Sequence, residues 1–193
     1  MAPTPRRGVR MSAIFVALSQ CPARPQAIAP DRRARAISLP CPRPRVEQGT
    51  PEGVRPLTAV LLDTSCIVAL LDRSERHHQE CVDVVSALAA PLITCEAVIA
   101  ESCYLVRDLK GAAAAVVENV DRGIFQIPYR LSGNALGVTK LVKKYAGVPM
   151  DFADACLVDM ASDYHTGRIL TLDADFRVYR WGRNRPFELL LTI

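Results

Sequence analysis

From residue 57 onward the chain alternates short apolar stretches with longer ones in which apolar residues recur every three or four positions. The short stretches are typical of buried strands, and the longer ones of amphipathic helices. The predicted strands are AVLL (59–62), PLIT (91–94), IFQIPY (124–129), RILTL (168–172) and FELLLTI (187–193). Strands that alternate with helices predict an α/β fold, a three-layer α/β/α sandwich with a mostly parallel central sheet.

The helices between these strands are predicted from their caps as well as from their periodicity. Their expected start points are residues that favour a helix N-terminus, namely Ser65, Ser74, Thr94, Gly111, Ser132 and Asp151. The five longer helices are expected to end near residues 89, 109, 122, 145 and 165, and Gly167 is expected to stop the last of them.

Four carboxylates occupy unexpected places in this pattern. Asp63 directly follows the first strand and Asp173 follows the fourth, so both should project at the carboxyl edge of the sheet, where such folds bind ligands. Glu101 and Asp154 share helical stripes with apolar residues that should face the core. A cap or a turn would explain any one acid, but burying an unpaired carboxylate costs several kcal/mol. The four together favour a shared site.

Convergence of these acids would need a compensating charge. Two carboxylates ~5 Å apart repel by about 3 kcal/mol at an effective dielectric constant near 20. The sequence places no lysine or arginine within the cluster to neutralise it. Mg²⁺ or Mn²⁺ would do so, because these cations prefer oxygen ligands and retain waters. Acid-bound metals of this kind hydrolyse phosphodiesters, so we expect Asp63 to hold metal.

Four stretches carry a family resemblance: LLDTSCIVALLDRSERHH, ITCEAVIAESCYLV, KYAGVPMDFADACLV and ILTLDADFRVYR. In this order they resemble the successive motifs of PIN-domain ribonucleases, particularly the VapC-like toxins of type II toxin–antitoxin systems. The resemblance spans residues 60–180. It implies a Mg²⁺- or Mn²⁺-dependent endoribonuclease that forms homodimers and has a cognate antitoxin that blocks its site.

The resemblance assigns roles by position. The four catalytic acids are Asp63, Glu101, Asp154 and Asp173. The first, third and fourth would bind the metal directly, and the second directly or through water. Ser65 matches the family's hydroxyl beside the first acid. Asp151 and Asp175 are further carboxylates nearby: the former also fits a helix cap, and the latter is an alternative to Asp173 as the fourth acid.

Basic residues near the third and fourth acids are candidates for RNA binding. They are Lys140, Lys143, Lys144, Arg177 and Arg180. The arginines are interleaved with Phe176, Tyr179 and Trp181, which suits phosphate binding combined with base stacking on single-stranded RNA. A solvated basic face whose aromatic side chains turn toward the core is an equally good interpretation.

Composition divides the 193-residue chain into two segments. Residues 1–56 hold ten arginines, three acidic residues and ten of the fourteen prolines, which gives a formal charge of +7 and predicts a disordered leader or a mis-called start. Residues 57–193 carry a formal charge of −3 and are the predicted catalytic domain.

The seven cysteines include no C-x-x-C pair. Cys66, Cys81, Cys95, Cys103 and Cys156 lie in apolar runs, which predicts buried free thiols in the reducing cytoplasm. No apolar run approaches the length of a membrane span.

Three other functions compete with the nuclease as interpretations of the sequence. A haloacid-dehalogenase-type phosphatase needs an acid two residues after the first, where this chain has Ser65. A response-regulator receiver needs paired acids early in the chain and a lysine after a late strand, where this chain has Asp173. The serious alternative is a catalytically inactive PIN-fold module that binds RNA or protein.

Overall fold

The computed structural model describes residues 59–191, which form a central sheet of five strands. Each strand pairs in parallel with its neighbours, in the spatial order β3-β2-β1-β4-β5. The strands are β1 (Val60–Leu62), β2 (Leu92–Ile93), β3 (Phe125–Gln126), β4 (Arg168–Leu170) and β5 (Glu188–Leu189). The prediction of a parallel sheet is therefore confirmed, while the predicted leader, residues 1–56, lies outside the described residues.

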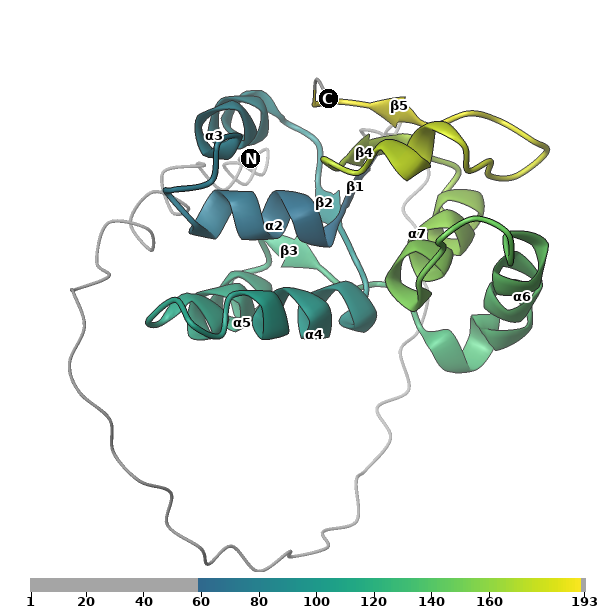
Figure 1. Ribbon diagram of the computed structural model, residues 1–193, viewed down its shortest axis with the longest axis horizontal. Helices are drawn as coiled ribbons and strands as arrows, with labels where there is room; N and C mark the ends of the chain where they lie inside the picture. Colours follow the sequence, from purple (N-terminus) through teal and green to yellow (C-terminus); the bar gives the residue numbers. More distant parts are fainter. Residues whose placement is uncertain (1–58, 192–193) are drawn as a thin grey trace, which may run out of the picture.

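Helices lie on both sides of the strands. They are α2 (Thr64–Leu71), α3 (His78–Ala87), α4 (Glu96–Leu105), α5 (Ala112–Asp121), α6 (Leu131–Lys144), α7 (Phe152–Asp163) and the short 3₁₀ helix η1 (Ala174–Arg177). In Figure 1, α2 and α3 lie to one side of β1 and β4, and the α6–α7 pair lies to the other. This arrangement confirms the predicted three-layer α/β/α sandwich.

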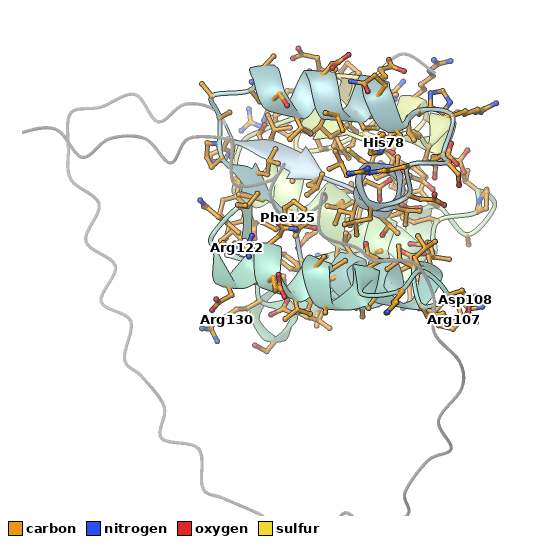
Figure 2. The ribbon with its side chains drawn as sticks, turned by 90° about the vertical axis from the view of Figure 1, so that its left-hand side faces the viewer. His78, Arg107, Asp108, Arg122, Phe125 and Arg130 are labelled. Carbon is orange, nitrogen blue, oxygen red and sulfur yellow. The ribbon has the colours of Figure 1, made fainter. Side chains whose placement is uncertain are left out.

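The core follows from the apolar runs. All three residues of β1 are fully buried, as expected for the middle strand of a sheet covered on both faces. Helix α7 is buried over most of its length, which explains why its sequence is apolar nearly all round. At the sheet edge, Phe125 points into the core while Arg122 and Arg130 lie at the surface (Figure 2).

The strand order places the topological switch point of the sheet beside the middle strand. From β1 the chain moves outward to β2 and β3, then returns to add β4 on the opposite side of β1. In sheets of this kind the crossovers on the two sides of the reversal leave an opening at the carboxyl ends of the two central strands. Asp63 lies there, and its backbone N–H donates to the carbonyl of Leu170 at the end of β4 (3.0 Å).

One predicted helix start is confirmed in detail, and a second differs by one residue. Helix α2 begins at Thr64 rather than at Ser65, and Asp63 caps it by accepting a hydrogen bond from the backbone N–H of Ser65. Asp151 caps α7 in a reciprocal capping box, in which its side chain accepts from the Asp154 N–H and the Asp154 side chain accepts from the Asp151 N–H. Gly111 precedes α5 with a left-handed backbone (φ 79°), a conformation that favours glycine.

Two other predicted caps, Ser74 and Thr94, are wrong because their hydroxyl groups bond elsewhere. Ser74 donates to Oδ1 of Asp72 (2.6 Å), and α3 begins at His78 instead. Thr94 is buried and donates to the carbonyl of Leu62 (2.8 Å), so α4 begins at Glu96 after Cys95. Helix α6 begins one residue before Ser132, with no side-chain cap.

The end of α7 also differs from its prediction. The helix ends at Asp163, and His165 takes the left-handed conformation (φ 52°) before Gly167 is reached. Gly167 serves a different purpose, because a Cβ atom at this position would run into the indole ring of Trp181. Its missing side chain permits close packing between the start of β4 and the C-terminal segment.

The five cysteines within residues 59–191 are free, as predicted. Cys66, Cys81, Cys95 and Cys156 are buried, whereas Cys103 is only half-buried. None of the helices within residues 59–191 is long and apolar enough to cross a membrane.

Candidate active site

Asp63 lies at the C-terminal end of β1 and is 5% exposed. Its Oδ2 atom accepts hydrogen bonds from the hydroxyls of Ser65 (2.6 Å) and Thr171 (2.8 Å). Burial raises the pKa of this carboxyl group, and the two hydroxyl donors oppose that shift by favouring the charged form. The hydroxyl of Ser65 thus lies beside the first acid, where the resemblance implies a supporting hydroxyl.

The same hydroxyls connect the ends of β1 and β4. The backbone N–H of Leu172 donates to Ser65 Oγ, and that of Asp173 donates to Thr171 Oγ1, both at 2.9 Å. The two side-chain oxygens lie 3.4 Å apart. This network fixes the backbone that leads to the fourth predicted acid.

Asp173 and Asp175 lie two residues apart at the start of η1. Asp173 caps it, because its Oδ1 atom accepts from the Asp175 N–H (2.8 Å), and Asp175 lies in the first turn. Both are half-buried. The negative charge of Asp173 helps to raise the pKa of Asp154, so Asp173 lies within electrostatic reach of the third predicted acid.

Glu101 projects from α4 and is partly buried, as its stripe position predicts. Its Oε2 atom accepts a hydrogen bond from the hydroxyl of Thr64 at the start of α2 (2.8 Å). The pKa of Glu101 is raised, first by burial and then by the charges of Asp151 and Asp63. Those two charges place Glu101 within electrostatic reach of two acids from other elements.

Asp154 lies in the first turn of α7 and is 6% exposed. Its pKa is raised to about 7, first by burial and then by the charges of Asp151, Asp63 and Asp173. Its Oδ2 atom accepts from the hydroxyl of Tyr179 (3.2 Å) and from the N–H of Asp151 (3.4 Å). Asp151 is exposed and acts as the helix cap, but its charge also adds to the cluster.

These electrostatic effects define one acidic cluster near the carboxyl ends of β1 and β4. Its members come from four separate segments of the chain. Its members are Asp63, Glu101, Asp151, Asp154 and Asp173. The ion pairs of Arg107 with Asp108, Arg122 with Glu118 and Arg168 with Glu188 all lie outside it. The four acids that the sequence argument selected therefore lie within electrostatic reach of one another.

The cluster suits a hard divalent cation in its chemistry. Its donors are carboxylate oxygens, and a cation would offset the repulsion that raises the pKa of Asp154. Within residues 59–191, no three Asp, Glu, His or Cys side chains are already arranged to hold a metal ion. Side-chain adjustment around a cation would therefore be part of binding.

Three supporting residues were missed by sequence reasoning: Thr64, Thr171 and Tyr179. Each donates a hydroxyl to a different acid of the cluster. Thr171 carried a weak signal, because it precedes Asp173 by two residues at the end of a strand. Tyr179 carried none, because its position among arginines fitted RNA stacking and core packing equally well and did not indicate a bond to an acid.

The predicted RNA-binding residues divide into two groups. Lys140, Lys143 and Lys144 are exposed along the last turns of α6. The Arg180 guanidinium instead donates to the backbone carbonyls of residues 177, 178 and 179. The aromatic residues beside it, Phe176, Tyr179 and Trp181, are buried, so the stacking interpretation is wrong for them and the core interpretation is confirmed.

Comparison with known proteins agrees with this architecture. The crystal structure of VapC20 from Mycobacterium tuberculosis, described as a sarcin-ricin loop cleaving toxin, matches with a TM-score of 0.59 at 17% identity, over 66% of this chain and 100% of that one. This match shows a common fold.

Sequence comparison identifies the family. The chain is 30% identical over 116 residues to ribonuclease VapC26 of Mycobacterium tuberculosis (strain ATCC 25618 / H37Rv), covering 59% of this chain and 86% of the relative. The model of the PIN domain matches residues 60–182. The chain therefore belongs to the PIN domain family.

Proposed function

We propose that this protein is a metal-dependent endoribonuclease that hydrolyses RNA phosphodiester bonds as the toxin of a toxin–antitoxin pair. The main support is the acidic cluster, in which mutually repelling carboxylates come from four segments of the chain. A relative named as a ribonuclease and a structural neighbour described as a toxin point the same way.

The proposed cofactor is Mg²⁺ or Mn²⁺. Asp63, Asp154 and Asp173 would hold it, with Glu101 bound directly or through water. When bound, such a cation would orient the scissile phosphate, activate water and offset charge on the leaving oxygen. The contribution of the chain itself is orientation: Ser65 and Thr171 hold Asp63, and the hydroxyl of Thr64 holds Glu101.

RNA would reach the acids along the C-terminal end of α6. Lys140, Lys143 and Lys144 supply exposed positive charge just before the loop that leads to Asp151 and α7. Backbone phosphates bind such groups without regard to sequence, and this attraction offsets the repulsion between RNA and an acidic site. Arg177 is also exposed and lies on η1 beside Asp173 and Asp175.

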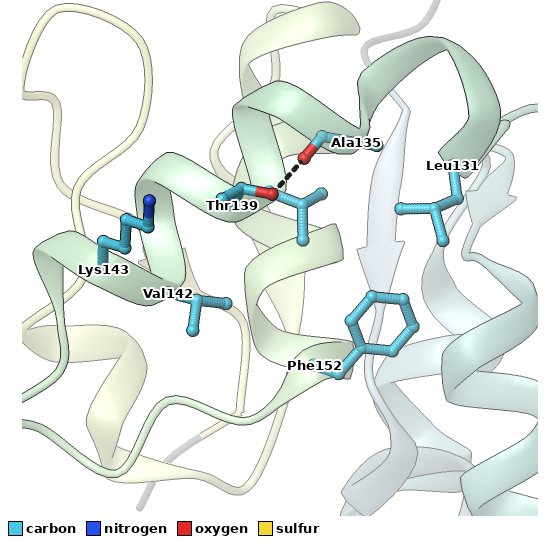
Figure 3. Close-up of a pocket in the computed structure, with 7 residues that line it drawn as sticks. Leu131, Ala135, Thr139, Val142, Lys143 and Phe152 are labelled. Carbon is cyan, nitrogen blue, oxygen red and sulfur yellow. Dashed lines mark hydrogen bonds between the residues drawn. The ribbon is translucent and has the colours of Figure 1, made fainter.

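A groove of about 370 Å³ along α6 supports the proposal of a homodimer (Figure 3). It is lined by Leu131, Ala135, Val138, Thr139, Val142, Lys143 and Phe152. Phe152 is 50% exposed and Val142 is 42% exposed, so apolar side chains face water there. A second copy of the chain would bury them.

The cognate antitoxin would need a surface of its own. Tyr104, Leu105 and Val117 form a second set of exposed apolar side chains on α4 and α5. Glu101 belongs to the same helix as the first two, so a protein bound there would lie close to the acidic cluster. The unpaired thiols of the core suit a protein of the cytoplasm, where we place both partners.

Cleavage of a mixed RNA pool by the full chain tests the proposed activity. We expect products with Mg²⁺ or Mn²⁺ and none with EDTA. Loss of groups that only support metal ligands costs 10–100-fold, so Asp63→Asn should lower the rate by at least about 100-fold. Asp121→Asn, which removes an exposed acid at the end of α5, should cleave at the wild-type rate.

The opposite result would favour the inactive binding module. Folded protein that leaves RNA intact with either metal, yet binds it, would show that the fold has kept its acids without the activity. Equal cleavage by wild type and Asp63→Asn would instead place the chemistry outside this cluster.

A further inference from the structure

Tyr179 is fully buried, yet its hydroxyl group reaches the acidic cluster. The oxygen lies 3.2 Å from Oδ2 of Asp154 and 3.3 Å from the carbonyl oxygen of Pro149. A buried tyrosine hydroxyl normally has a hydrogen-bond partner. Here that partner is a carboxylate of the proposed metal site rather than only a backbone group.

The ring of Tyr179 is held in place from two directions. Tyr145 packs against it edge-on at a centroid distance of 5.2 Å, and Phe176 does so at 5.3 Å. Phe176 packs in turn against Phe187. The next residue is also anchored, because the Arg180 N–H donates to the hydroxyl of Tyr145 (3.0 Å). The hydroxyl of Tyr179 therefore points to Asp154 from a rigid support.

Both hydrogen bonds that the Asp154 carboxylate accepts fall on one of its two oxygens. Oδ2 accepts from Tyr179 and, at the longer distance of 3.4 Å, from the Asp151 N–H. Oδ1 takes part in neither of these bonds. The carboxylate is thus held by one oxygen while the other remains available as a ligand.

We propose that Tyr179 is a positioning residue that orients the Asp154 carboxylate for metal binding through its hydroxyl group. This inference rests on the proposed function, because it concerns the same metal site. Partners that orient metal ligands change metal affinity by 10–100-fold when they are removed. Tyr179 also follows closely on Asp173 through η1, so one short segment supplies the fourth acid and orients the third.

The test is Mn²⁺ binding by the full chain. Binding is measured as the loss of the electron paramagnetic resonance signal of free Mn²⁺. Tyr179→Phe keeps the ring and removes only the hydroxyl group. We expect its dissociation constant for Mn²⁺ to rise about 10-fold or more. Its affinity for RNA in EDTA should match that of the wild type, because Tyr179 is buried and does not contact solvent.

Tyr145→Phe is the matched control. It removes a hydroxyl from the same aromatic cluster, but one that accepts from Arg180 and does not contact Asp154. We expect wild-type Mn²⁺ affinity from it. An equal loss in both variants would show that the packing of the cluster matters rather than the hydrogen bond to Asp154, and would overturn the inference.

Two further results would also overturn it, and they differ in what they imply for the enzyme. If the wild type binds Mn²⁺ and Tyr179→Phe binds it equally well, Tyr179 has no positioning role and the proposed function stands. If the wild type binds no Mn²⁺, the proposed metal-dependent activity fails together with the role of Tyr179.

Discussion

Uncharged hydroxyl groups support the acids of the acidic cluster. Thr171 donates to Asp63, Thr64 to Glu101 and Tyr179 to Asp154. A hydroxyl stabilises an ionised carboxylate by a hydrogen bond and adds no positive charge. Arginine or lysine in the same places would neutralise the cluster and compete with a cation. The choice of donors therefore preserves the negative potential on which the proposed metal binding depends.

The acids could be predicted from the sequence, whereas their donors could not. Asp63 and Glu101 stand out because a carboxylate on a strand end or an apolar stripe breaks a local pattern. Thr64 and Thr171 break none, because a threonine is ordinary at a helix start or in a strand. Their partners lie 37 and 108 residues away in the sequence, and only the assembled sheet brings them together.

Removing the charge of Asp154 should stabilise the metal-free protein. Its carboxylate is buried near Asp151, Asp63 and Asp173, so its ionised form is disfavoured in the folded state. We expect Asp154→Asn to melt at a higher temperature than the wild type in EDTA at pH 8, and to lose Mn²⁺ binding. A lower melting temperature with the fold intact would mean that the carboxylate contributes more through hydrogen bonds than it costs through repulsion.

The same group predicts how stability depends on pH in EDTA. Its pKa is about 7 in the folded state and near the ordinary aspartate value of 3.8 when unfolded, so the unfolded chain releases this proton at lower pH. The contribution of Asp154 to stability is therefore lost as pH rises from about 4 through 7. Urea unfolding at pH 6 and pH 8 should show a larger drop for the wild type than for Asp154→Asn.

At the scale of elements, the order of strands and helices was predictable and the helix starts were less so. Apolar runs locate the strands because each must be buried between helices. Ser74 and Thr94 looked like caps, but their hydroxyls bond Asp72 and the carbonyl of Leu62. A serine or threonine has many possible acceptors, and tertiary structure decides among them.

Gly167 offers a test of how the C-terminal segment packs on β4. A Cβ atom there would clash with the Trp181 indole, whose Nε1 donates to the carbonyl of Pro186 (2.9 Å). We expect Gly167→Ala to lower the free energy of unfolding by about 1–3 kcal/mol, the usual cost of overpacking. Urea denaturation measures it.

Gly133→Ala provides the comparison. Gly133 lies exposed within α6, and nothing stands within 4 Å of a Cβ atom built there. Alanine is favoured over glycine in helices, so this variant should gain roughly 0.5–1 kcal/mol. If both substitutions had the same effect, the close contact with Trp181 would not explain the glycine at position 167.

At the scale of the whole molecule, the apolar groove on α6 should decide the oligomeric state. We expect the wild type to sediment as a dimer and Val142→Glu to sediment as a monomer, because the glutamate would place a charge in the contact. Val117→Glu, at the exposed apolar set on α5, should remain dimeric. A wild-type monomer at every concentration examined would exclude the proposed contact.

The position of β4 in the sheet has a consequence for biosynthesis. β4 pairs with β1 although β2 and β3 are made first. Asp63 also accepts a hydrogen bond from Thr171, which directly follows β4. During translation, chains emerge from the amino end and domains fold as units. A ribosome that has made only the first three of the four predicted catalytic acids therefore carries an incomplete form of the proposed catalytic centre. The order of translation itself would keep a nascent nuclease from attacking the RNA around it.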